Sequence, residues 1–491
     1  MNRIDGRTVT SALHRRVDVV VIGSGPAGAA VAEVASAAGA SVLVVESGPW
    51  LEPADFALSA FDAMARGYRS MGASLVLGRA PMPYVQGRMV GGSAPINGAI
   101  CWRLPRDVYD GWAAADPGFG EARPWEELEE VTDAVEARIG VAPTDPAVAG
   151  PKNRLMADGA EALGLEHRPI RRNVRGCVGL GRCMQGCPKG AKQSPDRTLL
   201  LDAMASGATV LSSSTVDRVL HQGGVATGVV GRTEGGAPLR VDAERVVLAA
   251  SAVQSPALLL ASGIDQGPVG RHFQCHPGVS VAGRFEQPVR MWEGATQGHE
   301  VIGLRREGLK FEALGFGPAL LAARLPGVGS DLRARVDELP HWLDWGVALR
   351  ATGQGRVRRL FGRTVVTWSP STADVASFRR GMGVLGELLL AAGANAVAPG
   401  IQGVGLLGDA QAVLDAAPAR AAAYVGAITH MFGTCRMGSD PQTSVVRPDF
   451  RHHRIDRLYV ADSSVFPSNT GVNPQVSILA MATLCGREVT A

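Results

Sequence analysis

Three glycines stand between an apolar run and an alanine-rich segment near the amino end of the chain. Gly23, Gly25 and Gly28 follow VDVVVI and precede AAVAEVASAAGA, and Ser24 lies inside the turn. In this pattern the first glycine permits a tight turn, the second lets a pyrophosphate approach the backbone, and the third allows close helix packing. Glu46 ends the next apolar run, at the distance where a carboxylate accepts bonds from an adenosine ribose. The spacing predicts a bound dinucleotide, either NAD or FAD.

A second glycine-rich stretch, residues 87–112, carries polar side chains between its glycines. It reads GRMVGGSAPINGAICWRLPRDVYDGW and contains Gly91, Gly92, Ser93, Asn97 and Gly98. Glycines here would let the backbone pass against a flavin ring, while Ser93 and Asn97 offer contacts to the ring or the ribityl chain. The stretch resembles the first signature of the glucose-methanol-choline oxidoreductases, with a GGS turn, an Asn-Gly pair and a downstream Asp-x-Trp. The resemblance implies FAD.

Further stretches resemble this family in order and spacing over nearly the whole chain. They are ASAVQSPALLLASGI at 250–264, VGRHFQCHPGV at 269–279, THMFGTCRMG at 429–438 and LYVADSSVFPSNTGVNPQVSILAMA at 458–482. The likeness is weakest between 276 and 424, where substrate contacts are expected. The resemblance implies that the backbone of Val216 binds adenine, that Asp462 holds the ribityl and pyrophosphate region, and that Pro474 contacts the cofactor.

Two side chains in the last blocks resemble the family's catalytic positions. His430 matches its active-site histidine, and Asn473 matches a second position that is His or Asn among members. Oxidation of an alcohol removes the hydroxyl proton while a hydride leaves carbon for the flavin. An imidazole suits the first task, and an amide can orient the oxygen and stabilise its developing charge. The resemblance therefore implies His430 as general base and Asn473 as its partner.

The chain departs from the family pattern at two places. Ile96 stands where some members carry a histidine covalently linked to FAD, so we expect a dissociable, non-covalent FAD. The segment VVRPDFRHHRID at 445–456 replaces the usual VVDP and its continuation.

Three cysteines, Cys177, Cys183 and Cys187, lie in GCVGLGRCMQGCPKGAKQS. Thiolates followed by proline can hold an iron–sulfur cluster, and some dehydrogenase subunits of the family do so from a comparable region. The alternative is a loop of buried thiols near the substrate entrance, which we favour, so no metal is predicted. Cys101, Cys275, Cys435 and Cys485 are interpreted as small core residues.

The pattern of elements predicts an α/β protein in which a Rossmann-type FAD-binding domain is interleaved with an antiparallel-sheet substrate domain. Residues 17–48 form a βαβ unit, and strands are expected at 208–220 and 244–251. We assign residues 1–120, 195–275 and 425–491 to FAD binding, and 121–194 and 276–424 to the substrate domain. The latter has expected strands within 347–360 and 362–368 and a helix at 374–393.

Composition excludes several classes of protein. The chain has 491 residues, 46% hydrophobic and 19% charged, with a formal net charge of +3. These values support a large core and give no dense basic blocks, so nucleic acid is not an expected partner. No secretory signal or long apolar run is visible, and the few cysteines suit a reducing compartment. We expect a cytoplasmic protein with no membrane partner.

The substrate is expected to be a small-molecule alcohol, with oxygen or another electron acceptor as second substrate. The cysteine-rich loop resembles that of bacterial flavin dehydrogenases acting on sugar or aminoglycoside hydroxyls in antibiotic biosynthesis. For an amino sugar, the carboxylates of Glu293, Glu300 and Asp344 could bind the amines, although we favour solvated surface acids for these three. Trp292, Trp342 and Trp345 could stack on a sugar face or simply pack the sheet. Apolar steroid or long-chain alcohols are the alternative substrates. A flavin-scaffolded lyase and an electron-transfer subunit with an iron–sulfur centre are the other hypotheses.

Overall fold

A computed structural model describes residues 2–56 and 59–491, and its first sheet begins with the predicted βαβ unit. β2 (Leu13–Ile22), α1 (Pro26–Ala37) and β3 (Val42–Val45) form this unit, in which Val19, Val20 and Val21 are fully buried. The sheet order is β1-β9-β3-β2-β12-β11-β10, with β21 beside β12. Its other strands are β1 (Arg3–Asp5), β9 (Thr209–Ser212), β10 (Ser214–Gln222), β11 (Val225–Thr233), β12 (Pro238–Leu248) and β21 (Leu458–Val460).

The stretch predicted as a strand at 208–220 is two strands. Ser213 has a φ of 50°, which turns the chain between β9 and β10. β9 pairs in parallel with β3, whereas β10 pairs antiparallel with β11 at the end of the sheet. The sequence analysis predicted one strand because hydrophobic periodicity gives no sign of a single residue, here Ser213, in the left-handed conformation.

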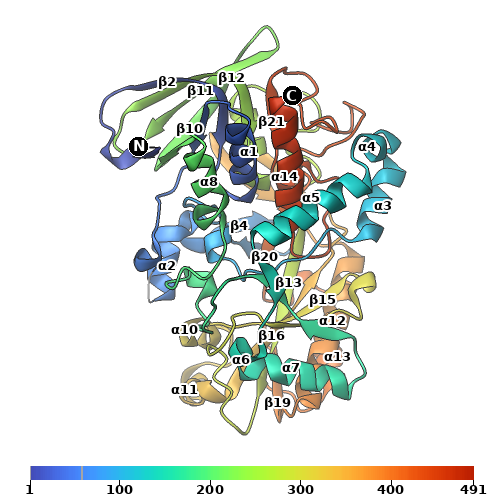
Figure 1. Ribbon diagram of the computed structural model, residues 1–491. Helices are drawn as coiled ribbons and strands as arrows, with labels where there is room; N and C mark the ends of the chain where they lie inside the picture. The colour runs from blue at the N-terminus through green and yellow to red at the C-terminus, as the bar shows by residue number, and fades with distance from the viewer. Residues whose placement is uncertain (1, 57–58) are drawn as a thin grey trace.

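The second sheet is mixed and lies below the first in Figure 1. Its order is β17-β18-β4-β5-β20-β13-β16-β15-β14-β7, with β19 beside β13. The strands are β4 (Ser74–Leu77), β5 (Met82–Tyr84), β7 (His167–Pro169), β13 (Gln274–Arg284), β14 (His299–Val301), β15 (Leu309–Ala313), β16 (Trp342–Leu349), β17 (Arg356–Leu360), β18 (Arg363–Thr367), β19 (Ala396–Pro399) and β20 (Gly426–Phe432). The strands and the helix predicted within 347–393 are confirmed, the helix as α12 (Thr372–Ala391).

Helices cover both sheets. α14 (Gln475–Thr490) packs on α1 so closely that a Cβ on Gly486 would lie 2.7 Å from the Val34 Cβ. The other helices are α2 (Ala60–Gly67), α3 (Arg106–Ala115), α4 (Pro117–Ala122), α5 (Trp125–Arg138), α6 (Pro146–Ala149), α7 (Pro151–Ala162), α8 (Leu199–Ala205), α9 (Ser251–Ala261), α10 (Pro318–Ala322), α11 (Gly329–Asp337) and α13 (Ala410–Ala416); β6 (Val141–Pro143) and β8 (Arg171–Asn173) pair with each other. Within the described chain, none of these helices has the length and apolarity needed to span a bilayer.

The two sheets draw on interleaved parts of the sequence. β4, β5 and β20 fall in stretches assigned above to the FAD-binding domain, yet they pair within the second sheet. The class predicted from the sequence, an α/β protein with a second, largely antiparallel sheet, is confirmed, while the exact domain boundaries stay a prediction.

Candidate active site

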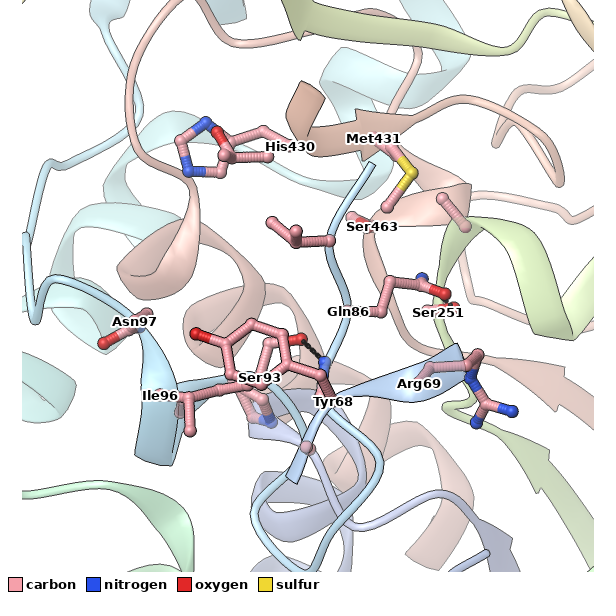
Figure 2. Close-up of a pocket in the computed structure, with 18 of the residues that line it drawn as sticks. Tyr68, Arg69, Gln86, Ser93, Ile96, Asn97, Ser251, His430, Met431 and Ser463 are labelled. Carbon is pink, nitrogen blue, oxygen red and sulfur yellow. Dashed lines mark hydrogen bonds between the residues drawn. The ribbon is translucent and has the colours of Figure 1, made fainter. Parts of the chain in front are cut away.

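A cavity of about 630 Å³ extends from the glycine turn after β2 to the second sheet. Gly23, Gly25 and Glu46 line one part of it, and His430 and Asn473 line another. Figure 2 shows His430 and Met431 facing Ser93, Ile96 and Asn97 across the space. The cavity therefore joins the two groups of residues that the sequence singled out.

The glycine turn is held by close backbone contacts. Gly23 has a φ of 98°, and a Cβ on Gly28 would lie 1.9 Å from the Gly23 carbonyl oxygen. The Glu46 carboxylate accepts from Ser24 N at 3.0 Å, Ser24 Oγ at 2.8 Å and Gly48 N at 2.9 Å. Ser24 and Gly28 do not line the cavity, whereas Gly25 and Glu46 do. Glu46 thus fixes the conformation of the glycine turn through these hydrogen bonds and also lines the cavity.

The second glycine loop packs against the first. Gly92 has a φ of 63°, and a Cβ there would lie 2.7 Å from the Gly25 Cα. Gly91 has a φ of 91° and does not line the cavity, and its amide donates to Ser24 Oγ at 3.1 Å. Only glycine fits these two positions, because a Cβ on Gly92 would fill the narrow space between the loops and a Cβ on Gly91 would lie 2.7 Å from Pro95 Cγ and 2.8 Å from Asp196 Oδ1.

The polar residues of this loop are held in place by the protein. The Ser93 hydroxyl accepts from Gly87 N at 2.9 Å, the contact dashed in Figure 2. Asn97 accepts from Ala99 N at 2.8 Å and donates to the Gln475 side chain. A Cβ on Gly98 would lie 2.0 Å from Gln297 Oε1, so this glycine lets the Gln297 side chain approach.

Three other predicted cofactor residues also line the cavity: Val216, Asp462 and Pro474. Val216 belongs to β10, the last strand of its sheet. Asp462 accepts from Ser251 N and Ser464 N, both at 2.9 Å, and burial raises the pKa of its carboxyl. Pro474 directly precedes α14. Asp462 is therefore engaged in fixing the start of α9, in addition to bordering the cavity.

His430 is paired with a second histidine that the sequence analysis gave no role. His276 and His430 are register partners on β13 and β20, with their Nδ1 atoms 3.2 Å apart. His276 Nε2 accepts from the Gly471 amide at 2.9 Å and lies 3.3 Å from Asn469 Oδ1. Burial lowers the pKa of His430 to about 3 and brings that of His276 well below its usual value. Both rings are neutral at neutral pH.

Asn473 is held by a buried lysine that the sequence analysis also missed. The Lys310 ammonium, 1% exposed, donates to Asn473 Oδ1 at 2.8 Å and pairs with Glu300 at 2.9 Å and with Glu312. Burial, which lowers the pKa of Lys310, is outweighed by the two carboxylates, which raise it. Lys310 and Glu312 alternate on the wholly buried strand β15. Two charges on one face of a buried strand were the signal available in the sequence.

The predicted substrate carboxylates and tryptophans do not line the cavity. Glu300 is fully buried against Lys310 and Arg168, and Asp344 is paired with Arg324 at 2.7 Å. Glu293 is half exposed beside Arg290. Trp342 and Trp345 are fully buried, and none of the three tryptophans borders the cavity. None of these side chains is placed to contact a substrate in the cavity, because each carboxylate has a cation beside it and the tryptophans pack in or against the core, the alternative stated above for them. The favoured interpretation as solvated acids holds for Glu293 but is wrong for the buried Glu300 and Asp344.

The segment that contains the three cysteines, residues 176–194, is hydrogen-bonded to the second glycine loop. Lys192 Nζ donates to the carbonyls of Pro95 at 2.9 Å, Asn97 at 2.6 Å and Cys183 at 2.9 Å. Burial raises the pKa of the Cys183 thiol, but Lys192 and Arg172 outweigh it and the pKa is lowered. Among residues 2–56 and 59–491, no three His, Cys, Asp or Glu side chains are grouped closely enough to hold a metal ion.

Comparisons with known proteins agree with this geometry. Two models of the GMC oxidoreductase family match residues 17–278 and 360–482. A GMC-type oxidoreductase of Mycobacterium tuberculosis is 36% identical, over 95% of this chain and 75% of its own length. Long-chain-alcohol oxidase FAO4A of Arabidopsis thaliana is 29% identical over 96% of this chain and 68% of its own, and paromamine 6'-oxidase of Streptomyces fradiae is 27% identical over 95% and 90%.

The fold is shared with a solved structure. Pyridoxine 4-oxidase from Mesorbium loti superposes with a TM-score of 0.74 at 20% identity, covering 96% of this chain and 98% of the other. The chain belongs to the GMC oxidoreductase family. It is an FAD-dependent enzyme of alcohol oxidation, as the sequence analysis predicted.

Proposed function

We propose that the protein oxidises a CH–OH group to an aldehyde or ketone, with His430 as general base and Asn473 as the amide that holds the substrate oxygen. The observation that carries the proposal is that both side chains border the cavity that also contains the glycine turn. FAD, when bound, supplies the hydride acceptor. Oxygen or another electron acceptor completes turnover.

The residues of the cavity fit this cofactor. Gly25 and Gly92 leave a cradle that a Cβ would fill, and Gln86 Oε1 is a buried wall atom without a hydrogen-bond partner among the described residues. The amino end of α1 suits a pyrophosphate, because its amides are unpaired and the helix dipole favours negative charge. Ten of the predicted residues line the cavity and would contact FAD: Gly23, Gly25, Glu46, Gly92, Ser93, Asn97, Gly98, Val216, Asp462 and Pro474. Ser24, Gly28 and Gly91 do not line it and would act by shaping the two glycine loops.

We propose that FAD binds without a covalent link. Ile96 ends the short 3₁₀ segment Ala94–Ile96 and lines the cavity (Figure 2). Its hydrocarbon side chain offers no nucleophile. Denaturation of the pure protein should therefore release all yellow colour to the supernatant, and colour retained by the precipitate would refute this point.

His276 determines which ring nitrogen of His430 is available to accept the substrate proton. His430 Nδ1 faces His276, so Nε2 is the nitrogen left for the substrate hydroxyl. Base catalysis at His430 Nε2 requires the His430 proton on Nδ1, where His276 Nδ1 accepts it, and the His276 proton on Nε2, facing Asn469 Oδ1 at 3.3 Å. In the structure the Gly471 amide donates to that same Nε2 at 2.9 Å, so this tautomer forms only when the Gly471 amide turns away. His430 Nε2 is then free to take the hydroxyl proton, and the neutral His276 ring stabilises the imidazolium that forms.

Lys310 sets which end of the Asn473 amide meets the substrate. An ammonium only donates hydrogen bonds, so Asn473 must turn its carbonyl oxygen to Lys310. Its NH₂ group, which has no hydrogen-bond partner among the described residues, is left to donate toward the cavity. A fixed donor at this position stabilises the negative charge that grows on the substrate oxygen.

An alcohol with an apolar body is the substrate that the cavity favours. Its walls include Val279, Leu314, Phe316, Val347 and Met431. The wall carboxylate of Glu312 is already bound by Lys310 and, at 2.7 Å, by Gln297. The relatives include long-chain-alcohol oxidases, which agrees with this choice. An aminoglycoside hydroxyl is the second candidate, favoured by Glu312 itself and by paromamine 6'-oxidase.

Anaerobic bleaching of the FAD-loaded protein by a panel of alcohols tests the function. Steroids, aliphatic alcohols, sugars and aminoglycosides would be compared by their rate constants for flavin reduction. We expect bleaching, fastest with an apolar alcohol. If a compound is cleaved without bleaching, the lyase hypothesis replaces this one, and stoichiometric iron in the pure protein would support the electron-transfer subunit.

A further inference from the structure

The hairpin of β17 and β18, together with β4, forms one edge of the second sheet and has two different faces. Val357, Val366 and Val76 are aligned across the three strands and are buried. Because side chains alternate along a strand, Arg359 and Thr364 share this inner face, and both line the cavity. The outer face is therefore the reverse side of a cavity wall.

The outer face combines arginines with exposed apolar side chains. Arg356 and Arg358 of β17 alternate with the inner residues, Leu360 follows them, and Leu75 and Leu77 of β4 are 51% and 45% exposed. The tip residue Phe361 is fully exposed, at 104%. Large apolar side chains grouped on a surface mark a contact site rather than a chance exposure. We call these residues, with Arg363 beyond the turn, the hairpin face.

The charge of the hairpin face is uncompensated. RVRRLFGR at 356–363 holds four arginines in eight residues, and there is no Asp or Glu between Asp344 and Asp374 or between Asp62 and Asp107. Within the described residues, Arg356, Arg358 and Arg363 have no ion pair, and Arg359 donates only to the Gly362 carbonyl at 3.0 Å. A partner of negative charge fits this surface.

We propose that the hairpin face docks on the surface of an anionic lipid bilayer. Arginines attract the lipid headgroups, and Phe361 and Leu360 at the tip enter the boundary between headgroups and acyl chains. The aliphatic Leu75 and Leu77 suit hydrocarbon and cannot stack on nucleic-acid bases, which favours lipid over a nucleic acid. The inference goes beyond the proposed function and revises the prediction of no membrane partner, which rested on the absence of a long apolar run.

Vesicle sedimentation of the FAD-loaded full chain tests the proposal. The probes are vesicles of phosphatidylglycerol with phosphatidylcholine, and of phosphatidylcholine alone, each at low and high salt. The wild type should sediment with the anionic vesicles at low salt, at least tenfold more than with the neutral ones, and high salt should release it. Equal binding to both vesicles, or to neither, overturns the proposal.

Two variants and two matched controls locate the contact. Leu360→Ser/Phe361→Ser and Arg356→Gln/Arg358→Gln/Arg363→Gln should each weaken binding to anionic vesicles at least tenfold, with unchanged flavin absorbance and melting temperature. Val328→Ser, at a side chain 84% exposed, and Arg333→Gln, at one 77% exposed, lie elsewhere and should bind as the wild type does. Equal losses in the controls overturn the proposal. So does a wild-type dimer that Leu360→Ser/Phe361→Ser dissociates without any vesicle binding, because the occupant is then a second copy.

Discussion

At the amino end of α1 the cavity wall is made of backbone, whereas beside β13, β15 and β20 it is made of side chains, His430 and Asn473, that contact the buried His276 and Lys310. Gly25 and Gly92 bring two loops together where no Cβ fits. At the other end, His430 meets a histidine 154 residues away, and Asn473 meets a lysine 163 residues away. At the first end each turn is specified locally by its own glycines, although the two loops that meet are 67 residues apart. The second end is specified by pairs of side chains brought together by the strands of the second sheet.

The two ends of the cavity therefore have different tasks: the glycine end binds FAD, and the histidine and lysine end serves the reaction. Changes at the glycine end should alter how tightly FAD is held, with little effect on the loaded enzyme. Changes at the histidine and lysine end should alter the rate of flavin reduction or the stability of the sheet. Five predictions test this division.

His430→Gln should have the largest effect. Removal of the base should lower the rate constant of anaerobic flavin reduction by about 10²–10⁴, because proton transfer to a positioned side chain typically contributes that much. FAD content, measured by visible absorbance, should match the wild type. A rate within threefold of the wild type would remove His430 from the mechanism.

Lys310→Met should lower the free energy of unfolding and also lower the rate constant of flavin reduction. Glu300 and Glu312 would be left without their ammonium, and breaking a buried pair by removing one partner costs about 3–5 kcal/mol. Urea unfolding measures this loss. Lys152→Met is the matched control: Lys152 is equally buried, but among the described residues it donates only to the Glu293 carbonyl, and burial lowers its pKa to about 7. The Lys152→Met variant should lose less free energy of unfolding than Lys310→Met.

A double-mutant cycle shows whether Lys310 acts through Asn473. If it orients the amide, Lys310→Met should slow flavin reduction in the wild type but add little in the Asn473→Ala background. Fully additive effects would show that Lys310 serves only the stability of the sheet.

Gly92→Ala should mainly weaken FAD binding. The new Cβ would lie 2.7 Å from the Gly25 Cα at a φ of 63°, and such backbone strain costs on the order of 1–3 kcal/mol. We expect a roughly tenfold higher dissociation constant for FAD, which corresponds to about 1.4 kcal/mol. Gly39→Ala is the control, since Gly39 has a φ of 89° and nothing within 4 Å of its Cβ position. Equal losses of affinity would show that strain, not the contact between loops, is responsible.

The same division explains what the sequence could predict. The βαβ unit and its glycines were predictable, because turn chemistry and hydrophobic runs are local. His430 and Asn473 were placed only by the family resemblance. His276 was missed, since a lone His carries no local pattern that indicates its partner across a sheet. Lys310 was missed although it alternates with Glu312 in LKFEA, because that pattern does not indicate Asn473 as its partner. Glu300 and Asp344 were considered as substrate carboxylates because the sequence does not show that Lys310, 10 residues away, and Arg324, 20 residues away, fold back to pair with them.

The pH dependence should show the smallest effect and should separate stability from rate. With a pKa of about 3 in the folded protein, against about 6.5 in the unfolded chain, His430 binds a proton on unfolding. The free energy of unfolding should therefore fall as pH drops below about 6.5, by up to about 1.4 kcal/mol per pH unit for each such imidazole. His276, whose pKa burial also lowers, adds to this slope.

The rate constant of flavin reduction should not follow that fall, because His430 stays neutral and able to accept a proton in the folded enzyme at mildly acid pH. Melting temperatures and anaerobic rates would be measured over the same pH series, for the wild type and for His430→Gln. The variant should lose the share of the stability slope that one imidazole contributes. A rate that declines with an apparent pKa near 6.5 would mean that the base titrates as if in water, and the histidine end of the cavity would then be open to water.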